Sequence, residues 1–228
     1  MRAGNGFSNS SLTDVMASLM AIFVLLFVAA QNNRGVGMKN ARNEVLKQLK
    51  GELTKAGIDS AAIDSIPNDV STVVVILPDS VLFDRGRDQM SESGRRVVRA
   101  ATPLLVGVLC DDVLRANLDQ LVVEGHTDNT IPTGLSAEEG RRYNLRLSQR
   151  RSMDFVTTST EQLTGDARLE CFLNLVSATG RGQEDPLPSE SPDAAPQRRV
   201  VLRVRLKTRM GDTTRVLPAT MGGVNAAR

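Results

Sequence analysis

Aromatic rings and histidine are scarce in this 228-residue chain, which has no tryptophan, one tyrosine, six phenylalanines and one histidine, His126. Proteins that bind sugars or single-stranded nucleic acid commonly stack the ligand on aromatic side chains, so the composition gives little support to either class. A single histidine excludes a histidine-rich metal site within one chain. Because no nucleophile or water-activating pair accompanies His126, we expect neither an enzyme nor a bound metal or cofactor.

A charge excess and cysteine motifs are missing too. The 28 Lys and Arg residues nearly balance the 26 Asp and Glu residues, and the net charge of +2 gives no reason to expect a direct nucleic-acid partner. The two cysteines, Cys110 and Cys171, form no CxxC pair. The length suits one membrane span and one domain of ordinary size.

One long apolar run lies near the N-terminus. Residues 12–30, LTDVMASLMAIFVLLFVAA, would form a helix about 28 Å long, close to the hydrocarbon thickness of a bilayer. We expect a transmembrane helix here, preceded by a short tail at residues 1–11. A cleaved signal peptide is one alternative, since FVAAQNN resembles a cleavage site, although only Arg2 precedes the run. A buried core helix is the other, but it would need protein on every side.

Asp14 lies at the mouth of this apolar run. A medium of low dielectric constant favours the neutral form of a carboxyl group, which would let Asp14 take up and release protons. An ionised aspartate in bare lipid is costly, so a helix of a partner subunit should face it. The alternative is a silent aspartate at the level of the lipid headgroups, favoured there by the helix dipole.

A linker, residues 31–70, separates the expected span from the first predicted strand. Residues 31–37 are polar and contain glycines, which indicates an exit from the membrane, and residues 58–70 have the composition of a loop. Between them, residues 38–57 predict an amphipathic helix that ends at Gly57. Its apolar residues recur at helical spacing: Val45, Leu46, Leu49 and Leu53.

Strand and helix patterns alternate from residue 72 onwards. Their order, β-α-β-α-β-β, predicts an α/β (α+β) domain with one mixed sheet and helices on one face. Ser91 is a candidate N-cap, and residues 209–228 are expected to form a flexible tail. The predicted strands are 72–78, 118–125, 171–180 and 198–208, of which the last should have an exposed face, and the predicted helices are 91–110 and 147–163.

Five segments of this region, in register, resemble the OmpA-like peptidoglycan-binding domain, and the resemblance covers residues 71–208. It implies a β-α-β-α-β-β domain whose cleft holds the diaminopimelate end of a cell-wall peptide. The segments are VLFDRGRDQMSESG (81–94), VVEGHTDN (122–129), YNLRLSQRR (143–151), SATGRGQEDPLP (177–188) and QRRVVLRV (197–204).

This resemblance implies that Asp128 and Arg151 bind the ligand and that Thr127, Asn144 and Leu147 match other positions of the family's motif. The chemistry agrees, because the amino-acid end of a peptide carries an ammonium and a carboxylate. A carboxylate acceptor and a guanidinium that face one another could bind both. The alternative is that Asp128 caps a turn and Arg151 makes an ordinary surface ion pair.

Two departures from the family pattern lie at the rim of the expected cleft. The loop at residues 130–143 is longer than in the shortest members, and SPDAAPQRR (191–199) replaces an asparagine-rich stretch. His126 is expected to pack or to hydrogen-bond beside the cleft.

A span followed by an OmpA-like domain resembles the layout of stator B-subunits of ion-driven motors, and TDVMASLMAIFVLLF resembles their signature. The resemblance implies that Asp14 carries the proton. It also implies four partners: a multi-span A-subunit in a five-fold ring, a second copy of this chain in a homodimer, peptidoglycan and the membrane. The short, hardly basic tail and the missing tryptophans favour the Zorya anti-phage B-subunit over the flagellar stator subunit. A passive wall anchor, which would not need Asp14, is a third class.

A wall-binding domain must lie outside the cytoplasm, so we expect a bacterial inner-membrane protein with a cytoplasmic N-terminus and a periplasmic domain. The positive-inside rule favours the opposite orientation. Arg2 precedes the span, and four basic residues follow it: Arg34, Lys39, Arg42 and Lys47.

Cys110 ends the first predicted helix of the domain and Cys171 opens its third strand, so both should lie at the same end of the domain. An oxidising periplasm would permit a disulfide between them. Two independent buried thiols are the alternative.

Overall fold

The computed structural model describes residues 8–66, 69–187 and 195–207, except for the side chains of residues 8–12 and 30–36. Most of the expected N-terminal tail (1–7) and the expected C-terminal tail (209–228) lie outside the described residues.

A five-stranded mixed sheet forms the centre of the domain, in the spatial order β1-β2-β5-β3-β4. Only β3 and β4 are parallel, and the other neighbours are antiparallel. The predicted α+β fold with one mixed sheet is confirmed. The strands are β1 (Ile63–Ser65), β2 (Thr72–Pro78), β3 (Leu118–His126), β4 (Val176–Gly182) and β5 (Arg199–Leu206).

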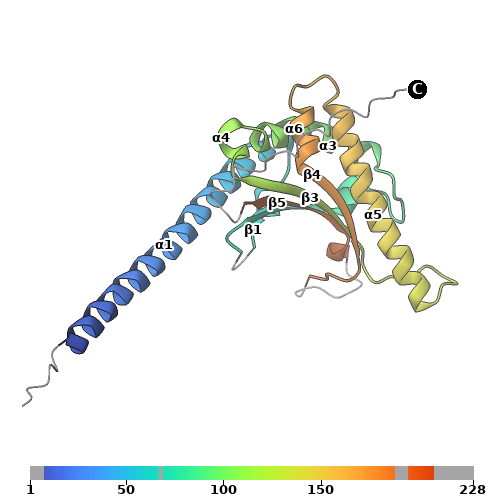
Figure 1. The fold of residues 1–228 in the computed structure, drawn as a ribbon. Helices are drawn as coiled ribbons and strands as arrows, with labels where there is room; N and C mark the ends of the chain where they lie inside the picture. The colour runs from blue at the N-terminus through green and yellow to red at the C-terminus, as the bar shows by residue number, and fades with distance from the viewer. Residues whose placement is uncertain (1–7, 67–68, 188–194, 208–228) are drawn as a thin grey trace, which may run out of the picture.

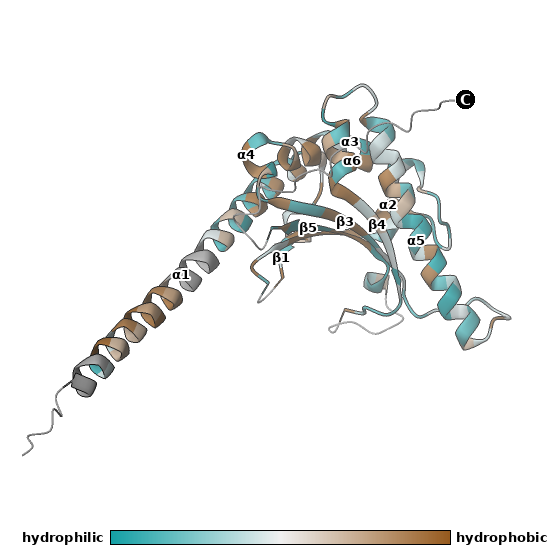
Figure 2. Ribbon diagram, viewed as in Figure 1, coloured by the Kyte–Doolittle hydropathy of each residue, from teal (hydrophilic) through white to brown (hydrophobic). Residues whose placement is uncertain are grey.

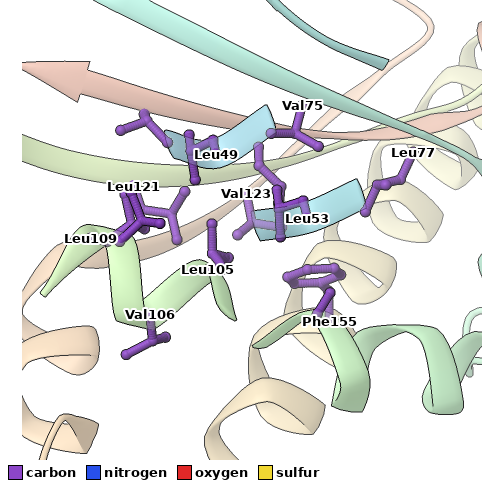
Figure 3. Close-up of a cluster of buried hydrophobic side chains, with 14 of the residues drawn as sticks. Leu49, Leu53, Val75, Leu77, Leu105, Val106, Leu109, Leu121, Val123 and Phe155 are labelled. Carbon is purple, nitrogen blue, oxygen red and sulfur yellow. The ribbon is translucent and has the colours of Figure 1, made fainter. Parts of the chain in front are cut away.

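Helices cover one face of the sheet (Figure 1). Ser91 caps α3, since its hydroxyl accepts a hydrogen bond from the amide of Gly94 at 3.1 Å, as predicted. Figure 3 shows how apolar residues of the sheet and of the helices meet in the core, with Leu105 and Phe155 lying near Val123. The helices of the domain are α2 (Asp79–Leu82), α3 (Glu92–Leu109), α4 (Asp112–Arg115), α5 (Ala137–Gln162) and α6 (Leu169–Leu175).

A single helix, α1 (Ser8–Leu53), projects from this domain (Figure 1). Residues 31–37, the expected exit from the membrane, lie within this helix. Glycine costs only about 1 kcal/mol in a helix interior, so glycines alone did not end the helix. It ends instead where predicted, in the 3₁₀ turn η1 (Thr54–Ala56) and at Gly57, whose φ of 82° suits glycine.

The C-terminal end of α1 belongs to the domain core rather than to a free linker. Val45, Leu49 and Leu53 are spaced four residues apart, so they share one face of the helix, and each is at most 1% exposed. Figure 3 shows Leu49 and Leu53 close to Val75 and Leu77 of β2. A fragment that begins at residue 58 would lose this part of the core.

The apolar segment of α1 has no such contacts. The side chains from residue 13 to residue 29 are exposed, and they form the hydrophobic part of the projecting helix (Figure 2). Within the set of residues with described side chains, no helix is long and apolar enough to cross a membrane. Residues 12 and 30, the ends of the expected span, lie outside that set.

Two predicted elements differ from the structure. The loop expected at 58–70 contains the edge strand β1. Residues 169–175 form α6, so β4 begins at Val176 rather than at 171, because a short apolar run does not distinguish a helix from a strand. The last strand alternates as predicted, since Val200, Leu202 and Val204 are in the core while Arg203 is partly exposed and Arg205 is exposed, although β5 lies between β2 and β3 in the sheet.

Helix α5 also begins ten residues earlier than predicted. Ser136 and Glu139 form a capping box, in which the Ser136 hydroxyl accepts from the Glu139 amide and the Glu139 carboxylate accepts from the Ser136 amide. Part of the expected 130–143 loop is therefore helical. Arg151 lies in the middle of α5.

A disulfide joins Cys110, which follows α3, to Cys171 of α6. The two Cα atoms are 6.1 Å apart, and the bond closes a segment with a sequence separation of 61. It ties together two helices on the same face of the sheet.

Candidate ligand-binding pocket

A pocket of about 140 Å³ lies where β3 ends beside α5 and beside the start of β5. All five residues selected from the sequence line it, so the structure brings them together, while their ligand-binding role stays a prediction. The lining residues are Arg85, Gly86, Thr127, Asp128, Thr130, Pro132, Tyr143, Asn144, Leu147, Arg151 and Arg198.

Two glycines allow α5 to lie close enough to the sheet to form one wall of this pocket. A Cβ atom on Gly125 of β3 would lie 2.1 Å from the carbonyl oxygen of Ser148, and one on Gly180 of β4 would lie 2.6 Å from the amide nitrogen of Gln149. Any larger residue at these positions would displace the helix and with it the side chains that face the pocket.

Asn144 holds the turn that follows β3. Its side-chain amide donates to the carbonyl oxygens of Asp128 and Thr130, each at 3.2 Å, and lies 3.0 Å from Oε1 of Gln183. The backbone amide of Thr127 donates to the carbonyl of Gly182 at 2.9 Å. The position of Asp128 is thus fixed from both α5 and the end of β4.

Arg151 is a buried charge and not a surface one, since it is only 1% exposed. Its Nη1 lies 2.9 Å from Oδ1 of Asp79, its Nε donates to the carbonyl of Arg87 at 2.9 Å, and its guanidinium lies 5.1 Å from the ring centroid of Phe83. The contact with Asp79 is an ion pair by distance but lacks hydrogen-bond geometry. Burial raises the pKa of the Asp79 carboxyl and lowers the pKa of Arg151, and the partner opposes each shift.

Asp128 is paired with Arg198. Its Oδ2 accepts from Nη1 of Arg198 at 2.5 Å, and its Oδ1 accepts from the backbone amide of Thr130 at 3.1 Å. Nε of Arg198 lies 3.8 Å from Oδ2 of Asp79. The ion pairs of the pocket therefore join Arg151 to Asp79 and Arg198 to Asp128, and none joins Arg151 to Asp128 directly among the described residues.

We call these four residues the cleft network: Asp79, Arg151, Arg198 and Asp128. Sequence reasoning missed Asp79 and gave Arg198 no role. Two signals pointed to them: a buried arginine needs a carboxylate partner, and Asp79 directly follows the predicted strand 72–78. The turn-capping alternative for Asp128 was partly right, since its carboxylate does cap the turn at Thr130.

A second set of buried charges, which we call the sheet-face network, lies on β3, on β5 and after β4. Nε of Arg203 donates to Oε2 of Glu124 at 2.5 Å, and the same oxygen lies 3.5 Å from Nε2 of His126. Nη2 of Arg203 lies 3.5 Å from Oδ2 of Asp185, and Arg199 donates to the Asp185 carbonyl at 2.8 Å.

Titration in the sheet-face network is strongly perturbed. Burial alone would raise the pKa of Glu124, but the contacts with His126 and Arg203 lower it to about 2. Burial lowers the pKa of His126, so its ring is neutral at pH 7. His126 lies within the sheet beside the pocket, as expected, although neither ring nitrogen makes a hydrogen bond of good geometry to the described residues.

Glu124, His126 and Asp185 are the residues of this network that could hold a metal ion, since their potential ligand atoms lie within 4.8 Å of one another. Arg203, however, already contacts both carboxylates, and Arg199 interacts electrostatically with both. A divalent cation would add positive charge beside two guanidinium groups, so these residues do not suit a metal site.

No family model matches the chain, and no curated protein matches it either. Solved structures share its fold. The crystal structure of a MotB-like protein from Desulfovibrio vulgaris superposes with a TM-score of 0.55 over 76% of this chain and 99% of that one, at 20% identity. At this identity the likeness establishes the fold alone.

Two further structures are similar at lower TM-scores. The cell wall anchor of the T6SS from Pseudomonas aeruginosa gives 0.44 at 20% identity, over 68% of this chain and 95% of that one. The periplasmic domain of Helicobacter pylori MotB gives 0.46 at 14% identity, over 63% and 80%.

Proposed function

We propose that this protein is the B-subunit of a proton-driven inner-membrane motor anchored to peptidoglycan, and that the motor belongs to a Zorya anti-phage defence system. The observation that carries the proposal is the pocket: it gathers charges of both signs on a fold shared with a MotB-like protein.

The pocket suits the amino-acid end of a cell-wall peptide, which has an ammonium and a carboxylate on one carbon. Asp128 is the acceptor for the ammonium. Arg151 is a fixed positive charge in the pocket wall, because Asp79 and the carbonyl of Arg87 hold its guanidinium in place. The arrangement contains no nucleophile beside a general base, so it binds a ligand and does not cleave it.

Sedimentation of the full-length, detergent-solubilised chain with purified peptidoglycan tests this role. Asp128→Asn should weaken binding by about 2–5 kcal/mol, because the ligand's ammonium then lacks a charged partner. Asp119→Asn is the matched control, since it removes the same charge from an exposed position of β3. Equal binding by the two variants would exclude Asp128 as a ligand contact.

The membrane part of the proposal concerns α1. Residues 12–30 span the inner membrane, with Asp14 as the proton carrier inside a ring of multi-span A-subunits and beside a second copy of this chain. The exposed apolar side chains of residues 13–29 support this assignment. Ser18, whose hydroxyl bonds the Asp14 carbonyl at 2.8 Å, offers a control position on the same helix.

Asp14→Asn keeps the size of the side chain and removes its titration, so it should abolish phage protection in a host that depends on this gene, at normal protein levels. Ser18→Ala should retain protection. Full protection by Asp14→Asn would favour a passive wall anchor, and loss of swimming in place of protection would favour a flagellar stator.

The domain is periplasmic in this proposal, with the N-terminus in the cytoplasm. The Cys110–Cys171 disulfide supports that side of the membrane, against the four basic residues that follow the span. Thiol blocking before lysis, followed by mass spectrometry without reductant, should recover the two cysteines as a linked pair. Complete alkylation of both would contradict the assignment.

A further inference from the structure

The two arginines of the pocket are held in different ways. Arg151 is 1% exposed and is fixed by a carboxylate, a carbonyl and an aromatic ring. The side chain of Arg198 is 26% exposed, and its short contact is to Asp128 alone, with Asp79 at 3.8 Å. Arg198 is therefore the guanidinium that can change partners without leaving a fully buried position.

The carboxylate of Asp128 is occupied on both oxygens. Thr130 donates its backbone amide to Oδ1, and Arg198 donates Nη1 to Oδ2. The Thr130 contact is part of the local turn and does not depend on a ligand. An incoming ammonium group must therefore compete with Arg198 for Oδ2.

The backbone of Arg198 is held by hydrogen bonds that do not involve its side chain. Its carbonyl accepts from the amide of Asp79 at 3.0 Å, and its own amide donates to the carbonyl of Ala195 at 3.0 Å. These bonds hold Arg198 at the edge of the pocket, directly before β5. A change of partner needs only rotation about side-chain bonds.

We propose that Arg198 is a specificity-determining residue of the pocket, an inference that rests on the proposed binding of an amino-acid head group. In the free protein Arg198 donates a hydrogen bond to the Asp128 carboxylate. On binding, the ligand's ammonium takes Oδ2 of Asp128 and Arg198 moves onto the ligand's carboxylate, so no charge loses its partner.

This exchange selects for ligands that carry both charges. A simple amine would take Asp128 from Arg198 and offer no carboxylate in return, which leaves a partly buried guanidinium with only a distant partner. The pocket should therefore discriminate against amines, even though its acidic residue is well placed to bind one.

Calorimetric titration of the full-length chain in detergent tests the exchange with two probes. One is 2,6-diaminopimelate, and the other is 1,5-diaminopentane, which has the same spacing of amines but no carboxylates. The wild type should prefer diaminopimelate. Arg198→Gln should bind diaminopentane roughly 3–5 times more tightly than the wild type does, because no side chain then competes for Asp128.

The same variant should bind diaminopimelate more weakly, so its preference should fall by more than about tenfold. Arg205→Gln is the matched control: it removes the same charge from an exposed position of β5, outside the pocket, and should match the wild type. Arg198→Lys keeps the charge without the planar fork, so its preference should be intermediate, and it serves as the test variant if Arg198→Gln does not fold.

Affinities of the Arg198 variant within about twofold of wild type for both probes would overturn the exchange and leave the wall-binding role intact. If the wild type binds neither peptidoglycan nor diaminopimelate, the proposed function fails. Diaminopentane binding then still tests whether Arg198 competes for the Asp128 carboxylate. Tighter binding of diaminopentane by Arg198→Gln than by the wild type would show this competition, and equal binding would overturn it.

Discussion

The cleft network and the sheet-face network bury similar charges in different surroundings. Both place carboxylates against arginines, which lie on β5 or directly before it, except for Arg151 on α5. The cleft network borders a pocket, and its partly exposed member, Arg198, lines that pocket. The sheet-face network has no member in that pocket, and its arginines tie the segment after β4 to β5.

This difference distinguishes a candidate binding site from a structural ion-pair cluster. A buried pair is weak evidence for stability by itself, because desolvation offsets the attraction between the charges. In the sheet-face network each charge has a partner from another part of the chain, which fits a structural role. In the cleft network Arg151 is buried with three contacts, while Arg198 is partly exposed in the pocket, which fits the proposed ligand-binding role.

The largest effect is expected for the fixed member of the cleft network. Arg151→Met leaves the Asp79 carboxylate buried without its 2.9 Å partner, so the free energy of unfolding at pH 7 should fall by about 3–5 kcal/mol. Because the pKa of Asp79 is already raised, its protonation should reduce this loss at acidic pH. Urea denaturation of residues 38–228 followed by circular dichroism measures it, in a fragment that retains the buried residues of α1.

Arg150→Met is the control for that change, since the neighbouring arginine is 69% exposed and pairs with a partly exposed Asp88. It should cost less than about 1 kcal/mol. Losses of the same size in the two variants would show that the cleft network does not depend on the burial of Arg151.

An effect of intermediate size is expected when the sheet-face network is titrated. The pKa of Glu124 in the folded state, about 2, lies below its ordinary value of 4.5, so its stabilisation is complete above pH 4.5 and is lost as the pH falls towards 2. This lowering of the Glu124 pKa corresponds to about 3 kcal/mol of stabilisation of the folded state at neutral pH. The lowered pKa of His126 has the same sign, so its contribution to stability is lost as the pH falls below its ordinary value of 6.5.

Urea denaturation between pH 7 and pH 2.5 would measure this loss. Arg203→Met removes one cause of the lowered pKa of Glu124, so the variant should be less stable at pH 7 and should lose less stability on acidification. Parallel pH profiles for the variant and the wild type would mean that Arg203 does not set the titration of Glu124.

The sequence predicted which residues line the pocket better than it predicted how the charged side chains pair there. The five residues matched to the family motif all line the pocket. A motif keeps a fixed order of strands and helices along the chain, so its positions come to lie in the same part of the fold. Which carboxylate meets which guanidinium depends on distances across the sheet. Asp79 and Arg151 are 72 positions apart in sequence, and no local pattern joins them.

The predicted bounds of helices and strands were wrong where a local sequence signal was ambiguous or was overlooked. The capping box at Ser136 and Glu139 was present in the sequence and marks the true start of α5. Strand β1 has three residues and only one is buried, so its pattern is too short to identify. The burial of Val45, Leu49 and Leu53 followed from helical spacing, but spacing alone could not say that their partner is the sheet.

The smallest effect on stability is expected for the replaceable member of the cleft network. Arg198→Gln should lower the free energy of unfolding of the same fragment by less than about 1 kcal/mol, because its side chain is partly exposed and solvent screens the pair. Asp128 also keeps its bond from the Thr130 amide. A cycle with Asp128→Asn should give a coupling energy of about 0.2–1 kcal/mol between the two side chains. A loss as large as that of Arg151→Met would show that Arg198 is fixed in the same way, and the contrast between the two arginines would not hold.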